Sequence, residues 1–81
     1  MKKFLKIVEI LPDQSSIPEE KRRKPEICYY RGTYPNNYIL TTDYKRAFRF
    51  EQDDPNLKDV YKILKKDFRD CHVFICNDLR G

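Results

Sequence analysis

"DPNLKDVYKILKKDFRD", residues Asp54 to Asp70, is the stretch that decides the fold. Its apolar side chains recur at the spacing of one helix face, and they are Leu57, Val60, Tyr61, Leu64 and Phe68, with Ile63 flanking the stripe. Asp54 suits the N-cap and Pro55 the first helical position, and basic residues near the far end complement the helix dipole. The stretch is therefore predicted to be an amphipathic helix.

Four segments around this helix have the composition of strands. Lys2–Leu11 is rich in Ile, Val and Leu and ends at Pro12. Residues 26–32 and 37–42 follow as a second and a third strand, joined by the turn residues "TYPNN" into a predicted hairpin. "CHVFIC", Cys71–Cys76, comes after the helix as the fourth.

The segment between Pro12 and Pro25 is polar and lacks apolar periodicity. It is predicted to be a long loop, with room for one helical turn capped by Ser16 and opened by Pro18.

"TTDYKRAFRF", residues 41–50, fits two structures. Thr42 or Asp43 would cap a short helical turn that carries Tyr44 and Ala47 inward. Alternation would instead put Phe48 and Phe50 on one face of a strand. The short turn is the favoured prediction.

The order of these elements predicts one α+β domain over residues 1–81, with a polar loop at 12–25. It is a four-stranded, mostly antiparallel sheet with one main helix on one face. A ferredoxin-like sandwich is the alternative, and it requires the 12–25 loop to form a second helix.

The composition favours a cytoplasmic protein. The chain of 81 residues is 40% hydrophobic and 37% charged, with a net charge of +4. No segment approaches the roughly 18 apolar residues of a membrane span, and Lys6 and Glu9 interrupt the N-terminal stretch that resembles a signal peptide. An odd cysteine count fits a reducing compartment better than a disulfide framework.

Several classes of chemistry are disfavoured. Cys71, His72 and Cys76 lie close in sequence, but along a strand residues 71 and 76 point to opposite faces, so a core strand explains them better than a metal site. His72 is the only histidine and the chain has two glycines, too few for a phosphate or oxyanion loop. The sequence therefore predicts no enzyme, no metal, no cofactor and no small-molecule substrate.

Tyrosines gather in the basic middle of the chain. Tyr29 and Tyr30 must face opposite sides of a strand, so that one joins the core and the other is displayed beside Arg31, Tyr34 and Tyr38. Exposed tyrosine and arginine are typical anchors of a protein interface. They also suit stacking on single-stranded bases. These five residues are the predicted partner-binding set.

A basic run precedes the tyrosines and consists of Lys21, Arg22, Arg23 and Lys24. Such a cluster is the usual electrostatic footprint for phosphate backbones. Glu19, Glu20 and Glu26 flank it and reduce its field, so a solvated loop is the competing interpretation.

From about Glu26 onward the pattern resembles a type of very small protein that is frequent in phages and mobile elements. The resemblance rests on the hairpin, the "TTDYKRAFRF" connection with Ala47 and Phe50 three apart, the helix at Asp54–Asp70 and the strand at Cys71–Cys76. Such proteins mostly lack assigned enzymatic activity, and several of similar size bind and modulate host proteins. The resemblance implies a binding protein of this class.

The expected function is therefore that of a small non-enzymatic protein that modulates or inhibits a host macromolecule by binding it. A host protein is the first expected partner. The alternative is a nucleic-acid-binding module that uses Lys21–Lys24 and neighbouring tyrosines, and a subunit of a larger enzyme is a more distant third.

Overall fold

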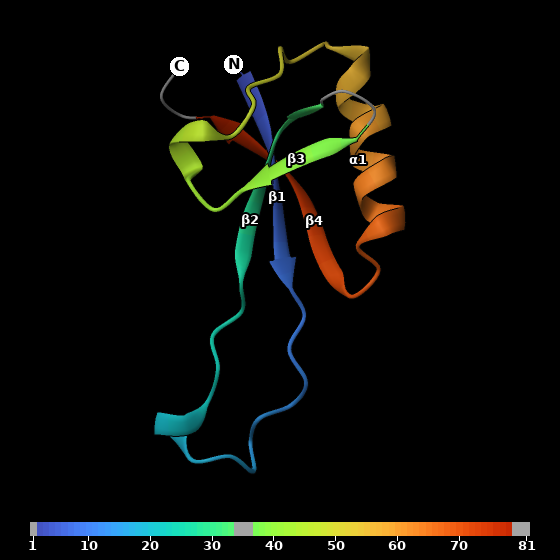
Figure 1. The fold of residues 1–81 in the computed structure, drawn as a ribbon. Helices are drawn as coiled ribbons and strands as arrows, with labels where there is room; N and C mark the ends of the chain where they lie inside the picture. The colour runs from blue at the N-terminus through green and yellow to red at the C-terminus, as the bar shows by residue number, and fades with distance from the viewer. Residues whose placement is uncertain (1, 34–36, 79–81) are drawn as a thin grey trace.

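The computed structural model describes residues 2–33 and 37–78 and has the expected α+β architecture (Figure 1). The sheet is antiparallel throughout, and its strands lie in the order β3-β2-β1-β4. The elements are β1 (Lys2–Glu9), β2 (Ile27–Thr33), β3 (Tyr38–Thr41), α1 (Pro55–Asp67) and β4 (Cys71–Asp78). Strand order along the chain and the single main helix confirm the predicted fold class.

Helix α1 begins as its sequence predicts. The Asp54 side chain accepts a hydrogen bond from the Asn56 N–H at 2.9 Å, and Pro55 occupies the first turn. The helix ends at Asp67, three residues before the predicted end. Of the four strands, β4 is the one that α1 contacts most extensively.

The core lies between α1 and one face of the sheet. Leu5 and Ile7 of β1 point toward the helix and are 0% and 2% exposed, and Leu64 of α1 is 0% exposed. Alternation along β1 sends Phe4 to the opposite face, where it packs against Tyr44. We call these the helix side and the open side of the sheet.

The connection from β3 to α1 begins with the favoured short turn. A 3-10 turn spans Tyr44–Arg46, and the Asp43 side chain caps it by accepting from the Lys45 N–H at 3.0 Å. The chain then joins the edge of β1, because Phe50 and Lys3 exchange backbone hydrogen bonds of 2.7 and 2.9 Å. This path carries the chain to the start of α1.

Residues 10–26 form an arm that extends beyond the end of the sheet (Figure 1). The arm contains one 3-10 turn, Glu19–Lys21, whose N-cap is Pro18 and which has no side-chain cap. The prediction that Ser16 caps this turn is therefore wrong. Because the arm contains no second helix, the ferredoxin-like alternative does not apply.

The pairing of β2 with β3 is interrupted by a bulge. Tyr30 pairs with Leu40, but the next pair is Gly32 with Ile39, so Arg31 is the extra residue. Gly32 has a φ of 152°, which an L side chain rarely adopts. Among the described residues no helix is long and apolar enough to cross a membrane.

Candidate functional site

The two adjacent tyrosines lie on opposite sides of the sheet, as the sequence predicted. Tyr30 is 5% exposed on the helix side, stacks on Phe50 with 5.6 Å between ring centroids, and shares a 2.6 Å hydrogen bond with the Thr33 hydroxyl. Tyr29 is half-buried on the open side and contacts the Tyr44 ring at 5.8 Å. Tyr30 is thus a core residue and not an exposed anchor.

Of the other predicted anchors, the structure describes Arg31 and Tyr38, and Tyr38 lies on the opposite side of the sheet from Tyr29. Arg31 is exposed at the bulge. Tyr34 lies outside the described residues. Tyr38 is half-buried on the helix side, where its hydroxyl donates a hydrogen bond to Asp67 Oδ2 at 3.0 Å and its ring lies 5.9 Å from that of Phe68.

Tyr38 instead marks a hollow between β3 and α1. The hollow measures about 280 Å³, and the residues that line it are Tyr30, Thr33, Asn37, Tyr38, Val60, Ile63 and Asp67. Buried Tyr30 belongs to its floor, while Tyr38 and Ile63 stand on the two elements that flank it. Ile63 is 51% exposed, the largest exposure among the chain's large exposed hydrophobic residues that the structure describes.

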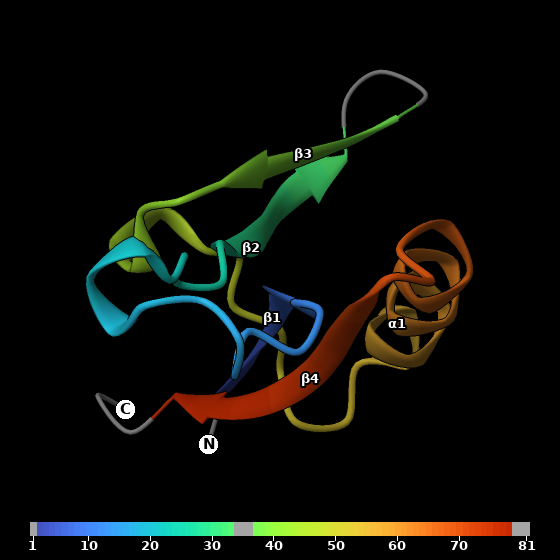
Figure 2. The ribbon, with the colours of Figure 1, turned by 90° about the horizontal axis from the view of Figure 1, so that it is seen from below.

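Geometry explains why this side of the sheet is incompletely covered. Four strands at about 4.8 Å spacing make a sheet roughly 19 Å wide, whereas one helix with its side chains is about 10 Å across. Figure 2 shows α1 beside β4, with β3 at the far edge of the sheet. Within residues 2–33 and 37–78, no second helix covers the apolar side chains that β2 and β3 present on this side.

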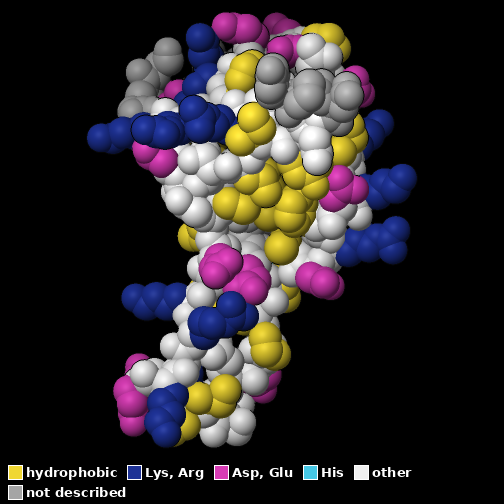
Figure 3. Space-filling view, viewed as in Figure 1, with side chains coloured by type: hydrophobic (Ala, Val, Ile, Leu, Met, Phe, Trp, Pro, Cys, Tyr) yellow, Lys and Arg dark blue, Asp and Glu magenta, His cyan; other side chains and the backbone are white. Residues whose placement is uncertain are grey.

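A second hollow of about 160 Å³ lies on the same side, against the end of α1. The residues that line it are Ile7, Glu9, Glu26, Cys28, Phe68 and Cys71. The contact of Tyr38 with Phe68 links the two hollows. Together they form what we call the helix-side groove, which Figure 3 shows as a hydrophobic patch with acidic side chains along its lower and right-hand borders.

The groove has an uncharged floor and an acidic rim. Burial raises the pKa of the Tyr38 phenol, and the hydrogen bond and charge of Asp67 raise it further. Burial likewise raises the pKa of the Cys28 thiol, with smaller contributions from Cys71 and Glu26. Both groups are therefore neutral at pH 7. Glu26 and Asp67 supply negative charge at the borders.

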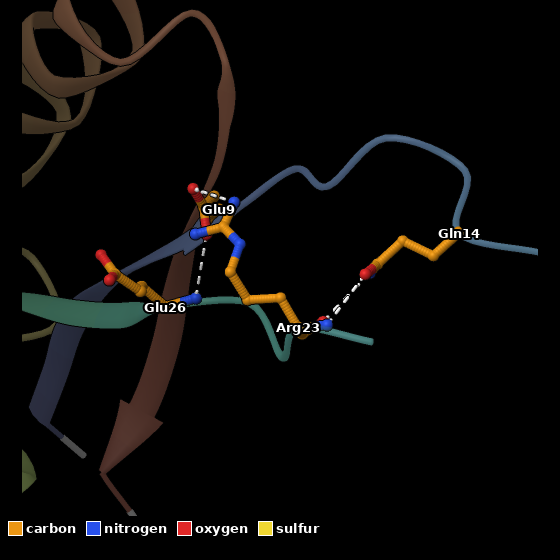
Figure 4. A network of polar contacts seen from close by, with 4 residues as sticks. All are labelled: Glu9, Gln14, Arg23 and Glu26. Atoms are coloured by element: carbon orange, nitrogen blue, oxygen red, sulfur yellow. Dashed lines mark hydrogen bonds and ion pairs between the residues drawn. The ribbon is translucent and has the colours of Figure 1, made fainter. Parts of the chain in front are cut away.

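Two members of the basic run, Arg22 and Arg23, bond to neighbouring parts of the chain, and Figure 4 shows the contacts of Arg23. Arg23 Nη2 lies 3.1 Å from Glu9 Oε2, and the Arg23 backbone exchanges hydrogen bonds of 2.8 and 3.0 Å with the Gln14 side chain. Arg22 Nε donates to the Ile17 carbonyl at 2.9 Å. Lys21 and Lys24 are exposed, and within the described residues their side chains form no hydrogen bond or ion pair.

Cys71 and Cys76, two members of the metal cluster considered from the sequence, lie on opposite sides of the sheet. Cys71 faces the core on the helix side, whereas Cys76 pairs with Phe4 and shares its side of the sheet. In residues 2–33 and 37–78 no three His, Cys, Asp or Glu side chains are arranged to hold a metal ion.

The sequence did not single out Ile63, Asp67 or Phe68 as site residues. Ile63 could have indicated the site, because it is a large apolar residue that lies beside the buried stripe of α1 and not within it. No protein-family model, curated protein or solved structure matches this chain.

Proposed function

We propose that this chain is a small non-enzymatic binding protein that holds a helical segment of a host protein in its helix-side groove. By occupying that segment it modulates or inhibits its partner. The observation that carries the proposal is the open apolar hollow between β3 and α1, flanked by Tyr38 and the exposed Ile63. Exposed apolar surface bordered by polar groups is typical of protein interaction sites.

A helix is the partner element that fits best. The uncovered part of the sheet lies alongside α1, in the position that a second helix takes when two helices cover one sheet face. Such a helix would place apolar anchors three, four and seven residues apart over Tyr38, Phe68 and Cys28.

The rim favours a partner helix with basic flanks. Glu26 and Asp67 border the groove at its two hollows. Complementary charge steers association and disfavours partners of the wrong sign. The same carboxylates would repel a phosphate backbone, which supports a protein rather than a nucleic acid as the occupant of this groove.

We also place this activity in the cytoplasm of the host cell. All three cysteines are free thiols, at positions 28, 71 and 76. Free, partly buried thiols fit a reducing compartment.

The test uses synthetic amphipathic helical peptides with one apolar stripe and either Lys or Glu flanks. Binding is measured by NMR shifts of Tyr38, Ile63 and Phe68. We expect the Lys-flanked peptide to bind and Ile63→Asp to abolish binding. Ile10→Asp is the matched control, since Ile10 is 46% exposed on the arm and lines neither hollow of the groove.

Equal binding of both peptides, or equal loss with Ile10→Asp, would contradict the proposal. Affinity purification from the host, with and without nuclease, extends the test to natural partners. A partner that survives nuclease, and that Ile63→Asp alone releases, supports the groove as its site. Loss of every partner after nuclease treatment would instead favour the nucleic-acid-binding function.

A further inference from the structure

The two edges of the sheet differ in how well they are protected. β3 has four residues, and the bulge at Arg31 disrupts its pairing with β2. β4 has eight residues, "CHVFICND", with no Lys, Arg, Pro or Gly among them. Natural edge strands are usually short, bulged, charged or covered, because unpaired backbone groups are a template for another strand. β4 has the features of an edge that receives a strand.

The backbone hydrogen bonds show which groups of β4 face outward. Ile10 donates to the Asp70 carbonyl, and β1 and β4 continue from that pair in register, with Lys6 opposite Phe74. In an antiparallel ladder alternate pairs exchange hydrogen bonds, so even-numbered residues of β4 bond to β1. The N–H and C=O groups of Val73, Ile75 and Asn77 therefore point away from the sheet.

Lys3 gives an independent check of this assignment. Its N–H and C=O bond to Phe50 on the side of β1 away from β4. Lys3 is the residue opposite Asn77, so that pair is not hydrogen-bonded across β1 and β4. In the part of the chain that the structure describes, no strand or side chain pairs with the outward groups of Val73, Ile75 and Asn77.

The side chains of β4 also leave apolar surface at this edge. Phe74 is 45% exposed on the open side of the sheet, and Ile75 is 40% exposed on the helix side. The His72 ring lies 5.9 Å from Phe74 and extends the exposed surface along the strand.

We propose that β4 pairs antiparallel with β4 of a second copy of this chain, about a two-fold axis at Phe74. Phe74 then lies opposite the partner subunit's Phe74 in a non-hydrogen-bonded pair. Side chains lie closer together in such a pair than in a hydrogen-bonded one. Val73 and the partner's Ile75 exchange two backbone hydrogen bonds. The two-fold axis produces a second, equivalent pair between Ile75 and the partner's Val73. The two sheets become one continuous sheet.

Most of β4 is self-complementary in this register, with Cys71 opposite the partner's Asn77 and His72 opposite the partner's Cys76. At the end of the strand Asp78 lies opposite the partner's Asp70, and the Arg49 guanidinium, 2.7 Å from Asp78, reduces the repulsion between these carboxylates. An aromatic pair forms at the centre. A two-fold contact needs this kind of self-complementary patch. A strand-to-strand contact of this length falls below the roughly 1,200 Å² of a standard interface, so the dimer is weak.

The experiment is sedimentation equilibrium of the intact chain under reducing conditions, from low micromolar to millimolar concentration. We expect a monomer–dimer equilibrium that Phe74→Glu weakens by about tenfold or more, since it brings two carboxylates together at the axis. The fold tolerates this change, because Lys6 lies directly opposite within the chain. The matched control is Ile39→Glu on β3, a site 40% exposed, which should leave the dimer intact.

A cross-linking measurement fixes the register. In a chain with Cys28, Cys71 and Cys76 replaced by Ala, Phe74→Cys should form a disulfide-linked dimer on mild oxidation, and Ile39→Cys should not. If the cysteine-free chain fails to fold, amide exchange of the natural chain replaces it: Val73, Ile75 and Asn77 gain protection with concentration. A monomer throughout, or a dimer insensitive to Phe74→Glu, overturns the proposal. Neither result bears on peptide binding in the groove.

Discussion

Arg49 Nε lies 2.7 Å from Asp78 Oδ2, and the two side chains are only 15% and 8% exposed. The Arg49 guanidinium also lies 4.9 Å from the ring centroids of both Phe4 and Tyr44, and it donates to the Ala47 carbonyl at 2.7 Å. Charge pairing, ring contact and hydrogen bonding thus join the β3–α1 connection to the end of β4 on the open side of the sheet.

Arg49→Ala should lower the free energy of unfolding by about 3–5 kcal/mol, because it removes the guanidinium that lies 2.7 Å from the buried Asp78 carboxylate. Urea denaturation measures the loss. The control is Arg46→Ala, since Arg46 lies 3.6 Å from Asp43 in an exposed pair whose removal should cost less than about 1 kcal/mol. Equal losses in the two variants would show that the Arg49 pair does not stabilise the fold.

Leu64→Ala should cost about 2–5 kcal/mol, because Leu64 is fully buried where α1 meets the sheet. A loss of this size would unfold much of a domain this small. Ile63→Ala, one residue earlier and 51% exposed, should change stability by less than about 1 kcal/mol. Thermal unfolding followed by circular dichroism compares the two, and a Leu64→Ala variant that melts like the natural chain would contradict this packing.

The elements were predictable because their signals are local. The stripe of α1 and its Asp54 cap lie within one stretch of sequence, and Leu57 and Leu64 are buried as that stripe requires. The Arg49–Asp78 pair joins residues 29 positions apart, so no local sequence pattern predicts it. The groove was missed for the same reason, since Tyr38 and Ile63 meet only when β3 is placed beside α1.

The bulge on β2 gives a prediction about backbone conformation. Gly32→Ala should destabilise the fold by about 1–3 kcal/mol, because an L residue is strained at a φ of 152°. Crowding contributes nothing, since no atom lies within 4 Å of the added Cβ. A synthetic chain with D-Ala at this position should recover most of the stability, because a D residue favours positive φ. Equal stability of the two alanine forms in urea would refute the argument.

Tyr38 should titrate above the ordinary tyrosine value of about 10. Its raised pKa means that the folded state favours the protonated phenol. The stability that this contributes is present below the unfolded pKa and is lost as pH rises through the folded pKa. Asp67→Asn should lower the Tyr38 pKa, because it removes the carboxylate that accepts the hydrogen bond and repels a phenolate. NMR titration of the labelled ring measures both values, and an unchanged pKa would count against the contact.

The basic run gives the last prediction, through salt dependence. The logarithm of affinity for duplex DNA falls with the logarithm of salt by about 0.9 per neutralised phosphate. The side chains of Arg22 and Arg23 are engaged with Ile17 and Glu9, so Lys21 and Lys24 alone should give a slope near ~−1.8 and weak binding, whereas four contacts would give ~−3.6. Replacing both lysines with Glu should abolish the slope. Binding at micromolar affinity with the steeper slope would mean that both arginines leave their partners, and would favour the nucleic-acid function.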